Sequence, residues 1–196
     1  MKNKIINEQK IIDITTNYDL PIFVYDEKTL LNSADKIINF PNSYGLTPRY
    51  AIKALPNATI IKLFDNIGLH FDASSRYEVE LLLKIGIAPK KIQLTAQELP
   101  NNLETLVKKG IYFNATSLHQ LESYGKLFPN SDISIRINPG IGSGHVQRTN
   151  VGGVTSSFGI WKDYIPQAKK IAEKYNLKIT KLHTHIGSGT DPDVWE

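Results

Sequence analysis

RYAIKALPNATIIKLFDNIGLHFDASSRYEVELLLKIG, residues 49–86, contains two strand–helix steps in direct succession. The apolar spacing predicts strands at 49–54 and 70–74, and each is followed by a helix, at 58–68 and 75–86. Glycine ends both helical segments, as expected for helix C-caps. Strands separated by helices predict βαβ units and therefore a parallel sheet.

The same alternation continues along the chain on both sides of this stretch. Further strands are expected at 91–96, 111–115, 133–138 and 178–187, and further helices at 101–110, 117–128 and 161–176. On the other side, helical spacing covers 27–40, and 21–26 is either a strand or a segment leading into the fold. Residues 1 to about 20 are polar, and we expect them to be irregular.

Two parallel architectures are compatible with this order, an open doubly wound sheet and a closed barrel. An open sheet usually carries a G-x-G-x-x-G turn after its first strand, whereas this chain has ALPNAT (54–59). The missing glycines favour the barrel. A (β/α)₈ barrel typically needs about 250 residues, so six units by residue 187 predict a truncated α/β TIM barrel. We expect residues 1–25 to lead into it and residues 26–196 to form the partial barrel.

Composition narrows the class of protein. The chain has 196 residues, of which 41% are hydrophobic and 21% charged, as in soluble globular proteins. It has no cysteine, which excludes disulfide scaffolds, thiolate zinc sites and cysteine nucleophiles. We find no secretory signal, no apolar run of about 20 residues and no basic stripe interleaved with aromatics. A cytoplasmic protein without nucleic-acid or membrane partners is expected.

Polar side chains stand where the expected strands end. These residues are Lys53, Asp72, Thr95, Asn114, Arg136 with Asn138, and His183 with His185. In barrels the carboxyl ends of the strands form one mouth, where the chemistry takes place. Each residue alone has a structural alternative: Lys53 as a surface lysine, Asp72 as a helix N-cap, and Arg136 as a partner within the barrel. Together they predict a site at this mouth.

Two glycine-rich loops follow strands. The long loop 139–153, with Arg148, suits an anionic ligand or a lid, or is a flexible surface insertion. HIGSG (185–189) leads out of the last strand, and its backbone N–H groups with the Ser188 hydroxyl could bind a phosphate. The spacing of His183 and His185 would allow a metal pair, but no third ligand is evident, so we expect no metal and interpret His183 as a satisfied core histidine.

Five motifs in order resemble the fold-type III pyridoxal-phosphate decarboxylases that act on diaminopimelate, ornithine and arginine. They are YAIKALPN (50–57), FDASSRYE (71–78), RINPG (136–140), SSFGI (156–160) and HTHIGSGTDPDVW (183–195). The resemblance covers residues 20–196, and its wording is closest to diaminopimelate decarboxylase. It implies a barrel of the alanine-racemase type, followed in the family by a β-domain that would lie beyond residue 196.

The resemblance also implies roles for individual residues. Lys53 would hold pyridoxal 5'-phosphate covalently, and His185 would stack on the pyridine ring, so these two would be catalytic. The cofactor phosphate would contact Gly187, Ser188 and Gly189. The remaining expected cofactor contacts are Asp72, Glu78 and Arg136. Glu78 also stands three residues after Ser75, at the spacing of a capping box.

The function implied is decarboxylation of meso-diaminopimelate to L-lysine by a homodimer of the full-length protein, with this chain alone inactive. Alternatives within the same chemistry are ornithine, arginine and carboxynorspermidine decarboxylases. An alanine-racemase-like enzyme and a non-catalytic pyridoxal-phosphate protein are the others. The chain departs from the family at Ser157, where many relatives have lysine, at 151–153 (Val-Gly-Gly) and at TAQELP (95–100).

Overall fold

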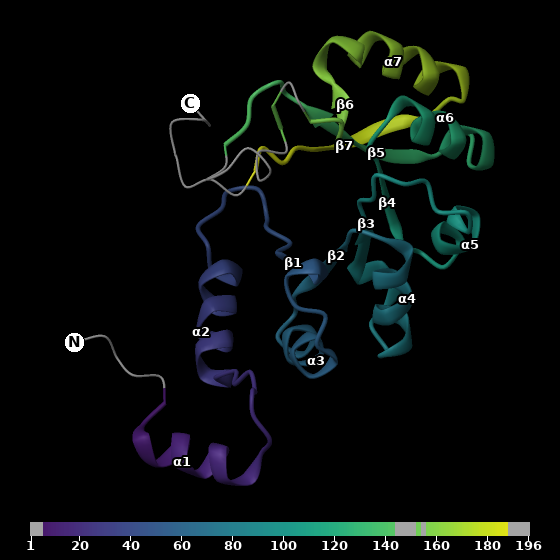
Figure 1. Ribbon diagram of the computed structural model, residues 1–196. Helices are drawn as coiled ribbons and strands as arrows, with labels where there is room; N and C mark the ends of the chain where they lie inside the picture. Colours follow the sequence, from purple (N-terminus) through teal and green to yellow (C-terminus); the bar gives the residue numbers. More distant parts are fainter. Residues whose placement is uncertain (1–5, 144–151, 154–155, 188–196) are drawn as a thin grey trace. The chain divides into compact units, whose positions relative to one another are not determined.

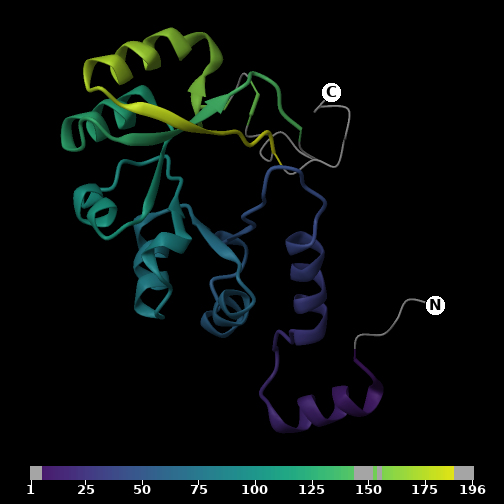
Figure 2. The same cartoon turned by 180° about the vertical axis from the view of Figure 1, so that it is seen from behind.

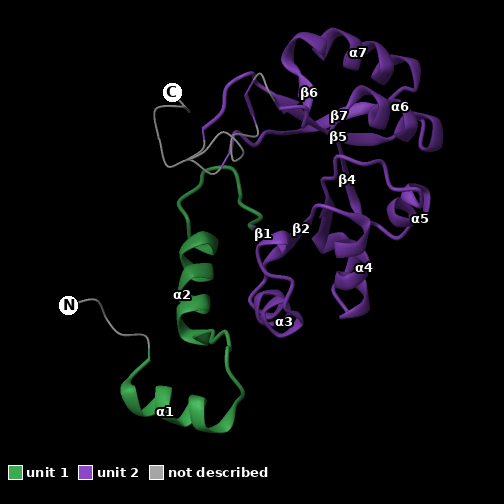
Figure 3. Cartoon of the chain, viewed as in Figure 1, with its two compact units in different colours: residues 1–48 green, residues 49–196 purple. Residues whose placement is uncertain are grey.

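The computed structural model describes residues 6–143, 152–153 and 156–187. Contacts along the chain divide it into two units, Met1–Pro48 and Arg49–Glu196, coloured separately in Figure 3. The predicted sheet lies entirely in the second unit. No helix in the described ranges is long and apolar enough to cross a membrane.

The first unit contains two helices, α1 (Glu8–Asn17) and α2 (Glu27–Ile38). Helix α2 was expected and begins at Asp26, whose carboxylate accepts a hydrogen bond from the Thr29 N–H at 2.8 Å. Helix α1 corrects the prediction of an irregular N-terminal segment. It begins at Asn7, whose side chain accepts from the Lys10 N–H at 2.9 Å, and it has no buried residue. Residues 21–26 form no strand.

The second unit is built on a parallel sheet of seven strands. Figures 1 and 2 show the strands following one another along a curved row, with the helices on its outer side. The order is β1-β2-β3-β4-β5-β6, and β7 also pairs with β5. The strands are β1 (Arg49–Ala51), β2 (His70–Ala73), β3 (Ile92–Leu94), β4 (Tyr112–Ala115), β5 (Asp132–Asn138), β6 (Ile160–Trp161) and β7 (Lys178–His183).

Each predicted strand–helix step is present in this unit. The α-helices are α3 (Ala58–Asn66), α4 (Arg76–Lys84), α5 (Leu103–Lys108), α6 (Leu118–Leu127) and α7 (Ile165–Lys174). Three 3₁₀ turns accompany them, η1 (Ile52–Ala54), η2 (Pro89–Lys91) and η4 (Lys162–Tyr164). The sheet stays open across the described residues, which confirms a partial α/β barrel. The two-residue strand β6 was not predicted.

Alternation along the strands separates an apolar face from a polar one. Phe71 and Ala73 on β2 are fully buried, whereas His70 and Asp72 point to the opposite face and are half-buried. The pattern repeats on β5, where Ile133 alternates with Ser134. The apolar face forms the core under the helices, and the other face gathers the polar side chains of the candidate site.

Candidate functional site

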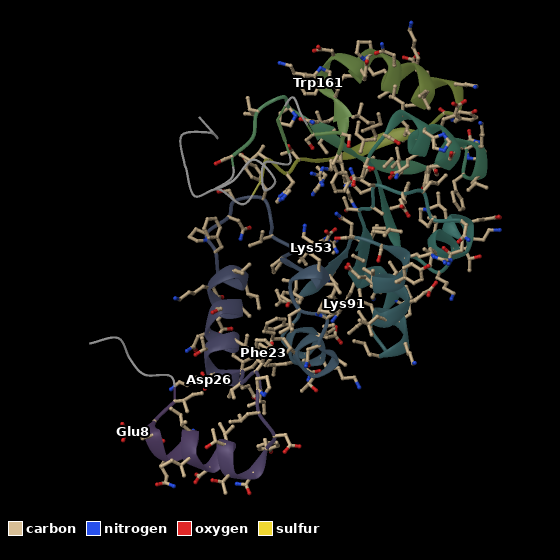
Figure 4. The ribbon with its side chains drawn as sticks, in the orientation of Figure 1. Glu8, Phe23, Asp26, Lys53, Lys91 and Trp161 are labelled. Atoms are coloured by element: carbon tan, nitrogen blue, oxygen red, sulfur yellow. The ribbon has the colours of Figure 1, made fainter. Side chains whose placement is uncertain are left out.

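Lys53 lies just beyond the end of β1. The expected strand 49–54 stops at Ala51, and the chain turns through η1, in which Ile52 is fully buried and Lys53 exposed. Burial of Ile52 fixes this turn and leaves Lys53, labelled in Figure 4, on the outside of it. Lys53 lines a cleft of about 610 Å³. The other cleft-lining residues lie at 74–77, at 96–101 and at Phe158.

Asp72 lies on the neighbouring strand, where Ala51 of β1 is in register with it. Its Oδ1 accepts hydrogen bonds from the Thr95 hydroxyl at 2.9 Å and from Gln93 Nε2 at 3.3 Å. Burial raises the pKa of the Asp72 carboxyl, while these two hydrogen bonds and the charges of Arg49 and Lys53 lower it. Asp72 is therefore a half-buried acid among cations, not the N-cap of the next helix, a role that Ser75 fills.

Arg136 is 3% exposed on β5, and its Cζ lies 3.7 Å from the centroid of the Phe158 ring. Its Nη2 donates to the His185 carbonyl oxygen at 3.5 Å, while its buried Nε has no hydrogen-bond partner among the described residues. Burial lowers the pKa of the Arg136 guanidinium to about 10, and the charge of Asp72 opposes this. The guanidinium therefore keeps a donor free inside the site.

His183 is the last residue of β7, and His185 lies two residues further along the chain. His183 is in register with Arg136, and its Nδ1 is buried without a hydrogen-bond partner in the part of the chain that the structure describes. The expectation of a satisfied core histidine is therefore not met at this nitrogen within the described residues. Burial, Arg136 and His185 lower the pKa of His183 to about 4. Burial, then Arg136 and Lys53, also lower the pKa of His185, so both rings are neutral near pH 7.

Glu78 takes part in the cap of α4. Its carboxylate accepts from the Ser74 N–H at 2.6 Å, and Ser75 Oγ accepts from the Glu78 N–H at 3.3 Å. This is the expected capping pair, displaced by one residue because the carboxylate bonds Ser74 rather than Ser75. Helix α6 begins in the same way, with Gln120 in the place of Glu78. A structural role for Glu78 is thus established, and a cofactor contact stays a prediction.

The expected phosphate loop is described only in part. Gly187 has φ of +134°, a conformation that favours glycine. Ser188, Gly189 and Arg148 lie outside the described residues. No group of three potential ligands that could hold a metal ion occurs in the ranges covered by the structure.

Phe158 is a site residue that the sequence reasoning missed. It belongs to the motif SSFGI, and in the structure it lines the cleft with Lys53 and contacts Arg136. Next to it, Ser157 accepts a hydrogen bond from Gln97 Nε2 at 3.3 Å, which connects the two loops at the cleft. An aromatic residue directly before a loop glycine was the signal available in the sequence.

The chain is similar to characterised decarboxylases over most of its length. Residues 32–194 match the family model described as pyridoxal-dependent decarboxylase, pyridoxal binding domain. Diaminopimelate decarboxylase of Buchnera aphidicola (subsp. Acyrthosiphon pisum) is 38% identical over 191 residues, which are 95% of this chain and 44% of that protein. The Streptomyces coelicolor diaminopimelate decarboxylase is 36% identical over 176 residues, 87% of this chain and 39% of that protein.

A solved structure has the same fold. A crystal structure of diaminopimelate decarboxylase superposes with a TM-score of 0.84 at 29% identity, covering 97% of this chain and 45% of that one. The chain thus spans less than half the length of the relatives that it matches. Within that length the cofactor of the matched domain is pyridoxal phosphate. This chain therefore belongs to the pyridoxal-dependent decarboxylase family, and the part of the family that it carries is the pyridoxal binding domain.

Proposed function

We propose that this chain is the cofactor-binding part of a decarboxylase that converts meso-diaminopimelate to L-lysine, with Lys53 as the lysine that holds pyridoxal phosphate. One observation carries the assignment: the exposed Lys53 amine opens on a cleft beside a half-buried carboxylate, Asp72, whose pKa its charge lowers. The choice of substrate is supported by relatives named diaminopimelate decarboxylase at 36% and 38% identity.

The residues present fit an anionic cofactor with an aromatic ring. Arg136 offers a buried Nε that has no partner among the described groups, so an incoming acceptor would satisfy it. His185 is neutral near pH 7 because burial and two cations lower its pKa, so its ring would add no positive charge against a pyridinium. A lysine amine at the cleft supplies the nucleophile that binds a carbonyl carbon.

When bound, pyridoxal phosphate supplies an electron sink for the electron pair left at Cα as carbon dioxide departs. The chain's own residues prepare that site. Lys53 Nζ would be the nucleophile toward a carbonyl carbon, and Asp72 lies close enough for the charge of Lys53 to act on its carboxylate. Arg136 Nη2 holds the His185 carbonyl and so fixes the backbone from which the imidazole projects.

We further propose that the 196 residues alone do not catalyse the reaction. Among the described strands, β1 pairs only with β2, and β6 and β7 each pair only with β5, so strand edges stay open. The site would then be completed in a full-length homodimer. A measurable decarboxylation rate from the isolated, monodisperse chain would contradict this part.

The assignment is tested on the longest protein that the native reading frame gives. It is incubated with pyridoxal phosphate, reduced with borohydride and digested, and the modified peptide is mapped by mass. We expect one pyridoxyl adduct on Lys53, lost in Lys53→Arg and kept in Lys90→Arg, which changes an exposed lysine. A folded protein without an adduct, or with adducts spread over surface lysines, would refute the cofactor assignment.

Substrate choice has a separate readout. Release of carbon dioxide from meso-diaminopimelate, ornithine, arginine and carboxynorspermidine is compared at equal concentrations. We expect diaminopimelate to give the highest kcat/KM. Preference for one of the other three substrates would assign the enzyme to polyamine synthesis instead of lysine synthesis. A Lys53 adduct without release of carbon dioxide from any of the four would favour a non-catalytic cofactor-binding protein.

A further inference from the structure

A row of polar side chains crosses the inner face of the sheet and ends at Asp72. Ser134 on β5 donates to Asn114 Oδ1 at 2.8 Å, and Asn114 Nδ2 on β4 lies 3.4 Å from Thr95 Oγ1. The Thr95 hydroxyl, just after β3, donates to Asp72 Oδ1 on β2 at 2.9 Å. Strands β2, β4 and β5 and the residue directly after β3 therefore contribute one member each.

The direction of these hydrogen bonds is fixed by counting donors. An ionised Asp72 carboxylate can only accept, so the Thr95 hydroxyl donates to it and the Asn114 amide nitrogen faces Thr95. The Asn114 carbonyl oxygen is then left to accept from Ser134. Thr95 Oγ1 also lies 3.3 Å from Gln93 Nε2. A hydroxyl has two lone pairs and one hydrogen, so with both lone pairs facing N–H donors the hydrogen is left for Asp72.

Burial keeps water from competing for these hydrogen bonds. Thr95 is 3% exposed and Asn114 is fully buried, so water does not replace either partner easily. The charged groups whose fields reach Asp72 come from three elements, Arg49 of β1, Lys53 of η1 and Arg136 of β5. Thr95, directly after β3, is a neutral donor, and among the described residues its hydroxyl donates to that carboxylate.

We propose that Thr95 is a positioning residue, which Asn114 and Gln93 orient so that its hydroxyl holds the Asp72 carboxylate ionised and in one orientation at the cofactor site. This inference rests on the proposed function. It gives a reason for Gln93 on β3 and Asn114 on β4, where apolar residues would otherwise pack. Without either of them, the Thr95 hydroxyl would no longer be held toward Asp72. A hydroxyl aimed at a carboxylate also lowers the pKa of Asp72 against the effect of burial.

The test uses the full-length protein and three variants. Thr95→Val removes the hydroxyl at nearly equal volume, and Thr95→Ser keeps it. Thr116→Val is the matched control, because Thr116 is equally buried at 3% and donates to the Ala96 carbonyl instead of to Asp72. The dissociation constant of pyridoxal phosphate is measured by titration across a pH series, and covalent capture on Lys53 is measured by borohydride trapping.

In Thr95→Val we expect the dissociation constant near neutral pH to rise roughly tenfold, the loss typical of a hydrogen bond to a charged group. The acid limb of binding should move to higher pH, because the ionised form of Asp72 loses a donor. Thr95→Ser should restore both values. Thr116→Val should bind as the parent protein does.

Two further outcomes are decisive. If Thr95→Val binds as Thr116→Val does, with the same acid limb, the inference is wrong. If Thr95→Val does not fold, Ser134→Ala replaces it, since this change frees the Asn114 amide but leaves every Thr95 contact; a smaller shift in the same direction supports the inference, and no shift overturns it. Failure of the parent protein to capture the cofactor on Lys53 would instead refute the proposed function.

Discussion

The Arg136 guanidinium lies over the Phe158 ring, with 3.7 Å between Cζ and the ring centroid, although the two residues are 22 positions apart in the sequence. Arg136 is 3% exposed, so the aromatic face replaces water that the cation lost on folding. The pairing leaves the Nε of the guanidinium without a partner among the described groups. Phe158 thus stabilises a buried cation without using up its donors.

Phe158→Leu should destabilise the protein by about 2 kcal/mol, because it keeps an apolar side chain and removes only the aromatic face from a desolvated cation. Urea unfolding measures the change. The matched control is Tyr77→Leu, which removes a ring 4.6 Å from Arg76 Cζ at a site where Tyr77 is 66% exposed. That change should cost about 1 kcal/mol or less. Equal losses at both sites would contradict a special role for Phe158.

Gly159 explains why the aromatic residue can reach Arg136. Its φ is +106°, and an added Cβ would meet the Asn138 backbone nitrogen at 3.0 Å and Arg136 Cγ at 3.3 Å. Gly159→Ala should therefore cost about 1 to 3 kcal/mol for the backbone conformation and a similar amount for crowding. Gly68→Ala separates the two, because Gly68 has φ of +92° with nothing within 4 Å. The difference in unfolding free energy between the variants measures the crowding alone, and no difference would show that the loop yields freely.

The order of strands and helices could be predicted because both periodicities are strong here. On β2, buried Phe71 and Ala73 alternate with Asp72, and the following helix has its cap at Ser75. The same signals placed Asp72, Arg136 and His185 at strand ends. Arg136 lies between the other two electrostatically, since the charge of Asp72 acts on the pKa of Arg136 and the charge of Arg136 acts on the pKa of His185.

What the sequence did not reveal depends on packing between distant segments. Strand β6 has only two residues, too few for any period, and Asn138 Nδ2 holds the adjoining loop through the Ser156 carbonyl at 2.9 Å. Helix α1 has no buried residue, so its sequence lacks the apolar stripe by which a helix packed on a core is predicted. The turn that exposes Lys53 follows from burial of Ile52, which a strand pattern describes equally well.

Glu78→Gln distinguishes a capping role from a role of its charge in the cofactor site. An amide oxygen can accept from the Ser74 N–H as Gln120 does from the Thr116 N–H at 2.8 Å, so the unfolding free energy should change by less than about 1 kcal/mol. Glu78→Ala should cost about 1 to 2 kcal/mol, because the half-buried Ser74 N–H loses its acceptor. If cofactor capture on Lys53 falls in Glu78→Gln while stability holds, the negative charge itself serves the site.

The equivalent exchange in the other helix should not be tolerated. Gln120 Nε2 donates to the carbonyl oxygens of Ala96 and Gln97, both at 2.9 Å, and the side chain is 1% exposed. Gln120→Glu would place a carboxylate oxygen against these two acceptors without water. A loss of more than about 2 kcal/mol is expected in the same urea assay, and a neutral result would mean that the buried amide contacts contribute little.

His183 should make stability fall as the solution becomes acidic. Its pKa is about 4 in the folded protein and 6.5 without these surroundings, so between these values only the unfolded chain takes up the proton. The contribution of the neutral ring is fully present above pH 6.5 and is lost as pH falls toward 4. At about pH 5 the loss should be about 1 to 2 kcal/mol, allowing for partial access of water to the ring.

Urea unfolding of the full-length protein at about pH 7.5 and about pH 5 measures this loss, with His183→Gln and His119→Gln compared at both values. Carboxylates titrate over the same range in every variant, so only the difference between variants reports on the histidine. His183→Gln should show a smaller pH dependence than the parent protein, because its side chain takes up no proton on unfolding. His119 is exposed on α6, and its replacement serves as the matched control for exchanging a histidine for glutamine. If both variants keep the slope of the parent protein, the ring of His183 is accessible enough to be protonated within the fold. The side chain in register with Arg136 would then be a cation at acidic pH.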